Sequence, residues 1–218
     1  MVKSTYKIEC MFSDEQLRFI KKASKLGLHG EVVEVYGSIS EHSVYRARPK
    51  YRISNLSLLE LEKYISKLHE MGIVFNYTLN SSSLGNLAQN QNSFKKIVEL
   101  AGKLIKIGVD KFTVSLPLVA KAIREVSKTI PLEVSTIAQV SSISQIVTWK
   151  EMYGVNSVCL GISSNRDIGL LSAMSKYSSK SGVGLYLNIW TNVTKQSIRW
   201  LIQTAVGGTP NSCLYFGA

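Results

Sequence analysis

Short runs rich in β-branched and aromatic residues alternate with longer amphipathic runs along the 218-residue chain. The short runs have the length and composition of β-strands, and the longer runs have the periodicity of helices. The expected strands are 6–12, 31–39, 73–80, 111–116, 132–137, 155–161, 183–190 and 212–218. The expected helices are 14–27, 57–71, 92–108, 117–128, 141–154, 165–182 and 194–208. Strands joined by crossover helices run parallel, and eight such units predict an α/β fold, a (β/α)8 TIM-type barrel.

The organisation of the chain follows from this regularity. No linker of unusual composition interrupts the alternation, so residues 1–218 are expected to form a single barrel domain. The eighth strand segment is not followed by a helix, and this would leave apolar surface uncovered. We therefore expect the chain to be the N-terminal part of a longer protein, or a further domain or partner to cover the eighth strand.

Composition restricts the setting and the cofactors. The apolar runs are far shorter than the roughly 20 residues that span a bilayer, and the N-terminus lacks a secretory pattern, so a cytoplasmic protein without membrane contact is expected. Cys10, Cys159 and Cys213 are scattered, and the three histidines form no ligand pattern, so no metal site within this chain is predicted. The net charge of +11 and the pI of about 9.6 leave two interpretations open, a polyanionic partner such as RNA or scattered surface lysine.

The segment 44–55 carries four basic residues and no acid, between an expected strand and an expected helix. In a TIM-type barrel such a strand-to-helix loop borders the active-site face, which is formed by the C-terminal ends of the strands. Arg46 and Arg48 are therefore candidates for binding a carboxylate or phosphate, because guanidinium binds these groups through two parallel hydrogen bonds. A solvated surface loop is the alternative.

Further candidates lie within or at the ends of other expected strands. Glu9 and Glu34 are acids flanked by apolar residues, and either one would be a candidate general acid or base if it pointed into the barrel. An outward or paired carboxylate is the alternative for both. The candidates for substrate binding are Asn80, Ser135, Thr136, Gln139, Asn188 and Trp190. Each of these also has a plain structural interpretation, as a turn residue, a strand-end hydroxyl or a packed aromatic side chain.

Three segments resemble a known family. They are "ARPKYRISNLSLLELEKYISKLHEMGIVFNYTLN" (47–80), "LEVSTIAQVSSISQIVTWKEMYGVNSVCLG" (132–161) and "LYFGA" (214–218). In order and spacing they are similar to the collagenase-like peptidases, peptidase family U-32. That family includes proteins classed as peptidases and others that hydroxylate RNA bases or ubiquinone precursors without oxygen.

The resemblance implies an enzyme domain that modifies an anionic small molecule, an RNA or a peptide at the C-terminal face of the barrel. A peptidase is one alternative, and a non-catalytic binding subunit is another. In the family, cysteines after the last of these segments bind an iron–sulfur cluster. This chain ends at Ala218, so a cluster is expected only if the parent protein continues. Ile162 and Ser163 stand where the family has an Arg-Glu pair, and this difference motivates the non-catalytic alternative.

Overall fold

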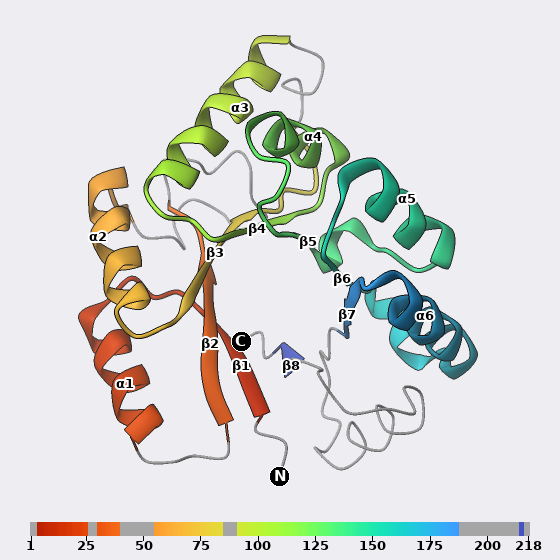
Figure 1. Cartoon of the computed structure of the whole chain (residues 1–218), viewed down its shortest axis with the longest axis horizontal. Coiled ribbons are helices and arrows are strands. Elements are labelled where there is room, and N and C mark those ends of the chain that lie inside the picture. Colours follow the sequence, from red (N-terminus) through yellow and green to blue (C-terminus); the bar gives the residue numbers. More distant parts are fainter. Residues whose placement is uncertain (1–3, 26–29, 40–54, 85–90, 188–213, 216–218) are drawn as a thin grey trace.

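The computed structural model describes residues 4–25, 30–39, 55–84, 91–187 and 214–215. The strands form one sheet in the order β7-β6-β5-β4-β3-β2-β1-β8, and every neighbouring pair is parallel (Figure 1). The strands are β1 (Ser4–Glu9), β2 (Gly30–Gly37), β3 (Val74–Leu79), β4 (Lys111–Val114), β5 (Leu132–Val134), β6 (Ser157–Cys159), β7 (Gly184–Tyr186) and β8 (Leu214–Tyr215). The helices are α1 (Asp14–Lys25), α2 (Leu58–His69), α3 (Gln91–Lys106), α4 (Pro117–Val126), α5 (Ile143–Tyr153) and α6 (Ile168–Ser181).

The sheet is strongly curled, with the helices on its outer side (Figure 1). β1 and β7 are six positions apart in the sheet order, and a flat sheet would separate them by about 29 Å at 4.8 Å per strand. Instead, the ammonium group of Lys7 in β1 lies 3.9 Å from the ring centre of Tyr186 in β7. The predicted TIM-type (β/α) fold is therefore confirmed, while the expected helix 194–208 lies outside the described residues.

Local sequence signals fix several helix ends. Ser57 and Glu60 form a capping box at the start of α2, where each side chain binds the other residue's backbone N–H. Gly154 follows α5 with φ of +59°, a left-handed conformation that glycine adopts without the steric cost of a Cβ. None of the described helices has the length and apolarity needed to cross a bilayer.

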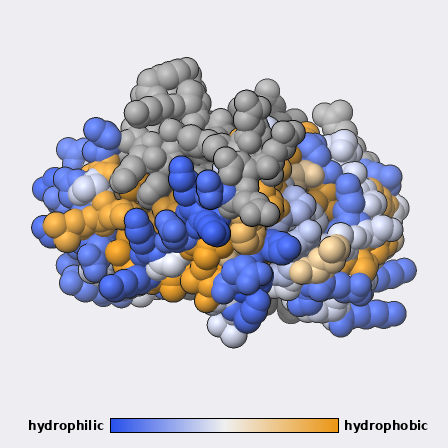
Figure 2. Space-filling view, turned by 90° about the horizontal axis from the view of Figure 1, so that it is seen from above, coloured by the Kyte–Doolittle hydropathy of each residue, from blue (hydrophilic) through white to orange (hydrophobic). Residues whose placement is uncertain are grey.

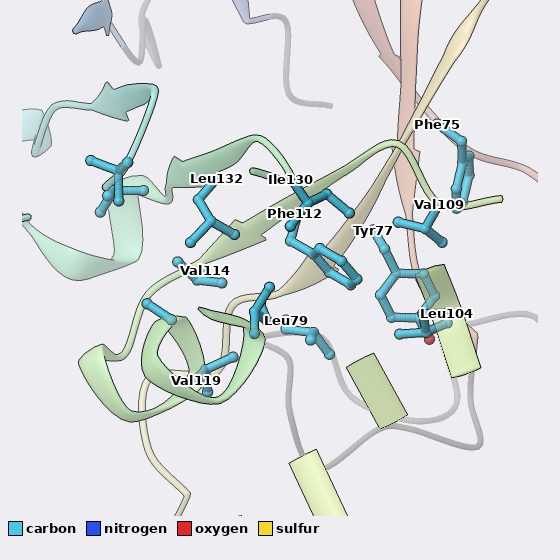
Figure 3. Packing of buried hydrophobic residues seen from close by; sticks show 14 of the residues in the cluster. Phe75, Tyr77, Leu79, Leu104, Val109, Phe112, Val114, Val119, Ile130 and Leu132 are labelled. Carbon is cyan, nitrogen blue, oxygen red and sulfur yellow. The ribbon is translucent and has the colours of Figure 1, made fainter. Parts of the chain in front are cut away.

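The apolar core lies between the sheet and the helices. Alternate residues of β3, such as Phe75, Tyr77 and Leu79, are completely buried on the helix side, and Phe112 of β4 packs edge-on against Tyr77 (Figure 3). Because side chains alternate across a strand, the remaining residues of each strand face the inside of the curled sheet. That inner face carries the site described next.

Candidate functional site

The inside of the barrel is lined by polar side chains. Its buried members come from six successive strands and are Lys7, Glu34, Asn76, Thr113, Glu133 and Ser157. TIM-type barrels usually fill this space with branched apolar residues. Here the outer face of the sheet is apolar and packs against the helices, as in other barrels, but the inner face carries charged and polar residues and so departs from that usual pattern.

Four of the inner residues form a buried cluster of opposite charges, called the ion tetrad below. The Lys7 Nζ lies 2.8 Å from Glu133 Oε2 and 3.5 Å from Glu34 Oε2. The Lys111 Nζ lies 2.6 Å from Glu133 Oε2 and 3.1 Å from Glu34 Oε2. Two ammonium groups therefore alternate with two carboxylates, and the cluster has no net charge.

Neutral groups complete the hydrogen bonding of the tetrad. The Asn76 amide donates to Glu34 Oε1 at 2.7 Å, and Thr113 in turn donates to Asn76 Oδ1 at 3.0 Å. Ser157 donates to Glu133 Oε2 at 3.1 Å. Buried charges are tolerated only when they are paired and hydrogen-bonded, and this arrangement meets that condition.

The tetrad holds its charges firmly. Burial alone would raise the pKa of Glu133, but the ammonium groups of Lys111 and Lys7 outweigh it and lower this pKa to about 2. Burial alone would likewise lower the pKa of Lys7, but the carboxylates of Glu133 and Glu34 raise it above its ordinary value. At neutral pH, Lys7 is therefore not an amine nucleophile and Glu133 is not a proton donor. The ion tetrad therefore places fixed charges in the interior of the barrel.

The ion tetrad and its partner Ser157 lie toward the N-terminal ends of the strands, since Lys111 is the first residue of β4 and Ser157 the first of β6. The C-terminal ends, where TIM-type barrels carry out their chemistry, lie above them. Polar residues occupy that level, and four of them, Glu9, Tyr36, Asn80 and Ser135, are called the strand-end group.

The strand-end group combines one carboxylate with neutral hydrogen-bonding groups. Glu9 and Tyr36 follow Lys7 and Glu34 by two residues, so they share the inner face. The Asn80 Nδ2 lies 3.5 Å from Ser135 Oγ, although β4 separates their strands in the sheet. Burial, together with the carboxylates of Glu34 and Glu133, raises the pKa of Tyr36, so its phenol remains protonated at neutral pH.

The other candidates from the sequence have varied surroundings. Glu34 is buried in the tetrad, where two lysines and an amide engage its carboxylate. Ser135 also caps a short 3-10 helix by accepting from the Ile137 N–H at 3.3 Å. Thr136 donates to the Leu160 carbonyl at 3.1 Å, and exposed Gln139 donates to the Thr136 carbonyl at 2.9 Å. Thr136 and Gln139 therefore hold the loop after β5 together, and only Ser135 joins Asn80 across the interior.

Four of the candidates, Arg46, Arg48, Asn188 and Trp190, lie outside the described residues. Conversely, the sequence analysis did not single out several residues of the interior, among them Lys7, Tyr36, Lys111 and Glu133. The signal that could have found them is the strict alternation of polar and apolar residues in segments such as "YKIE", "KFTV" and "LEV". A charged residue at an alternating position of several strands indicates that the interior itself is charged.

The described cysteines do not fit an iron–sulfur cluster. Cys10 lies on the helix side of β1, where its thiol contacts Tyr64 of α2, whereas Cys159 follows Ser157 by two residues and faces the interior. Burial raises the pKa of both thiols to about 12, so neither is a thiolate at neutral pH. Within the described ranges no group of three or more His, Cys, Asp or Glu side chains is arranged to hold a metal ion.

Comparison with known proteins identifies the family. The model of peptidase family U32 matches residues 19–188, which is most of the chain. The chain belongs to peptidase family U32. This agrees with the resemblance seen in the sequence, and no curated protein matches this U32 chain significantly.

Solved structures share the fold of this U32 chain at low identity. The structure of the U32 peptidase Mk0906 has a TM-score of 0.66 and 13% identity, over 95% of this chain and 79% of that one. A dipeptide epimerase from Methylococcus capsulatus has a TM-score of 0.58 and 11% identity, over 98% of this chain and 55% of that one. A 3,6-anhydro-D-galactonate cycloisomerase from Zobellia galactanivorans has a TM-score of 0.53 and 13% identity, over 94% and 49%. The chain thus spans about half of the last two proteins, and these likenesses concern the fold alone.

Proposed function

We propose that this chain is the barrel domain of a U32-family enzyme that binds an RNA substrate at the C-terminal ends of its strands and modifies it there. The observation that carries the proposal is the strand-end group (Glu9, Tyr36, Asn80, Ser135) above the ion tetrad. Family membership supports an enzyme, and the net charge of +11 supports an anionic polymer as substrate.

The strand-end group suits the recognition of an unpaired base. The Asn80 amide offers both a donor and an acceptor, which is what a base edge requires. The protonated phenol of Tyr36 adds a donor, and its ring adds a stacking surface. In this proposal Arg46 and Arg48 bind the phosphate or another anionic group of the same substrate.

Glu9 is the candidate acid or base of the reaction. It is half-buried, and it is the carboxylate of the strand-end group. Glu34 was an equal candidate from the sequence, but its oxygens already accept from Lys111 and Asn76. In the proposal Glu34 therefore holds the ion tetrad in place. The reaction class, family-type modification including hydroxylation, is carried over from the resemblance. Because Cys10 and Cys159 do not fit a cluster, no redox step is assigned to the described residues.

The experiment is a binding titration followed by a mass measurement. A fluorescein-labelled 20-nucleotide single-stranded RNA is titrated with the wild-type chain and with Asn80→Ala, and the fluorescence anisotropy is recorded. Loss of one neutral hydrogen bond is expected to weaken binding about two- to tenfold. Ser144→Ala, at an exposed position on α5, is the control and should bind as the wild type does. Unchanged affinity of Asn80→Ala would count against a substrate site at the strand ends.

Peptide hydrolysis is the second candidate function. It is favoured by the family itself and by the likeness to the U32 peptidase Mk0906. The strand-end donors and acceptors would also serve a peptide backbone. Mass spectrometry separates the two functions, because hydrolysis of unstructured casein gives fragments, whereas modification changes the mass of intact RNA. Cleavage of casein that is lost in Glu9→Gln would favour the peptidase.

A further inference from the structure

The outer faces of α3 and α4, with the turn that follows α4, are unusually basic. Six exposed lysines lie on them: Lys95, Lys96, Lys103, Lys106, Lys121 and Lys128. The exposed acids of the same segments are Glu99 and Glu125, which leaves a surplus of four positive charges out of +11 for the chain. More than a third of the net charge therefore lies on one part of the surface, called the α3–α4 face below.

Helical spacing places these lysines together. Lys95, Lys103 and Lys106 follow one another at intervals of eight and three residues, so they line one side of α3, while Ile97, Leu104 and their neighbours pack the opposite side into the core. The two helices lie side by side in Figure 1. A Cβ added to Gly102 of α3 would meet the Val126 side chain of α4 at 3.9 Å, an ordinary van der Waals distance, so the two helices pack against each other and form one surface.

Among the described residues, the six lysines have no ion-pair partner, unlike other surface charges. Lys67 of α2 pairs with Asp14 of α1 at 2.8 Å, and His69 lies 2.8 Å from Asp110. None of the lysines of the α3–α4 face is paired with a carboxylate of another described residue. Like charges at this density repel one another, and an external polyanion would relieve that repulsion.

The composition of the face selects the kind of polyanion. A membrane-binding helix pairs its lysines with exposed Trp, Phe or Leu side chains that enter the lipid. On the described parts of α3 and α4 the exposed large hydrophobic residue is Val126, at 38% exposure, and the strongly exposed ones lie on other elements, for example Phe19 and Met152. Figure 2, seen from the side on which α3 lies at the top of Figure 1, shows hydrophilic residues interspersed with hydrophobic ones.

We propose that the α3–α4 face binds the phosphodiester backbone of the RNA substrate and holds it beside the barrel mouth. From Lys95 to Lys106 the helix rises about 16 Å, which is long enough to contact several phosphates of one strand. α3 follows β3 in the chain, so its N-terminal end lies on the same side as the strand-end group. An RNA strand bound along α3 can therefore present a base to Asn80. This inference rests on the proposed function and adds to it the surface that captures the polymer.

The test compares two triple variants of equal charge. In the first, Lys95, Lys103 and Lys106 on α3 are changed to Gln. In the second, Lys21, Lys22 and Lys180 on α1 and α6, which are also exposed, are changed to Gln. Both variants reduce the net charge from +11 to +8, so total charge is held constant. Binding of the labelled 20-nucleotide RNA is measured by anisotropy between 50 and 200 mM KCl, and circular dichroism checks that both variants are folded.

We expect the α3 variant to bind RNA at least about tenfold more weakly at 100 mM salt. The slope of the logarithm of the binding constant against the logarithm of the salt concentration should become less steep by about 2, since each lost phosphate contact removes about 0.7 from it. The control variant should change affinity less than about threefold. Equal losses in both variants would overturn the proposal, because binding would then depend on total charge alone. Unchanged RNA binding together with lost binding to phosphatidylserine vesicles would overturn it in favour of a membrane. If Asn80→Ala weakens binding but the α3 variant does not, this inference fails while the proposed function stands.

Discussion

Replacing Glu133 by Gln should destabilise the protein strongly, because it removes one of the two carboxylates that balance two buried lysines. Glu133 is 1% exposed and accepts from Lys7, Lys111 and Ser157 at 2.8, 2.6 and 3.1 Å. With Gln in its place, the interior would hold two ammonium groups and one carboxylate. Removing one partner from a buried ion pair typically costs about 3–5 kcal/mol.

The pKa of Glu133 gives a second order-of-magnitude value for the same loss of stability. Its fall from the ordinary 4.5 to about 2 corresponds to roughly 3 kcal/mol of stabilisation at neutral pH. Because the pKa is lower in the folded state, this stabilisation is complete above pH 4.5 and is lost as the pH falls toward 2. The gap between wild type and Glu133→Gln should therefore be widest at neutral pH and close progressively below pH 4.5. Against a total stability of about 5–15 kcal/mol for a typical domain, the loss is large.

Urea denaturation at pH 7 and at pH 3, followed by circular dichroism, measures both effects. Asp14→Asn is the matched control, since it breaks the exposed pair with Lys67 and should leave the urea midpoint nearly unchanged. A second variant, Lys7→Met combined with Glu133→Leu, removes one charge of each sign and should recover much of the loss. A decrease of less than about 1 kcal/mol for Glu133→Gln, with an unchanged urea m-value, would refute the reasoning that the tetrad is buried and mutually dependent.

Three further outcomes follow from local geometry. Burial raises the pKa of Cys10 and Cys159 to about 12, so iodoacetamide at pH 8 should leave both unmodified in the folded protein and label them in urea, as peptide mass mapping would reveal; rapid labelling of the native protein would contradict this. Gly37→Ala would place a Cβ 2.7 Å from the Cβ of Cys10 and should lower the melting temperature. Gly102→Ala makes only an ordinary contact within a helix and should stabilise the protein by about 1 kcal/mol. Equal shifts of the melting temperature in the two variants would contradict both expectations. Ser57→Ala removes the capping box of α2 and should cost about 1 kcal/mol by urea denaturation, and an unchanged midpoint would show that the cap contributes little.

The sequence predicted the elements well because local periodicity determines them. The expected strand 73–80 corresponds to β3 (Val74–Leu79), and the expected helix 57–71 corresponds to α2 (Leu58–His69). For the described elements the errors lie at the ends, as for the expected strand 155–161, where the strand itself covers only Ser157–Cys159. Strand-end positions are set by which backbone groups find partners in the neighbouring strand, and periodicity does not report that.

The interior was harder to predict because its contacts join distant parts of the chain. Alternation could place Lys7 and Glu133 on one face of their strands, but it could not show that they meet. Their contact spans 126 residues and exists only because the sheet curls. Glu34 was singled out from the sequence as an acid within a strand, yet whether it would be free or paired depended on Lys7 and Lys111 from two other strands. Such pairing is a property of the assembled barrel.

The charged interior also has a consequence for the order of events in folding. The apolar layer between sheet and helices is built from neighbours in sequence, whereas the tetrad can form only after β1, β2, β4 and β5 have been brought into one curved surface. Until then its lysines and glutamates remain hydrated, and the curling step must strip that water from all four at once. The tetrad should therefore be absent from the folding transition state, so that its variants accelerate unfolding and barely alter the refolding rate in stopped-flow experiments. The interior charges would then set how long the barrel stays closed, and the apolar layer how fast it assembles.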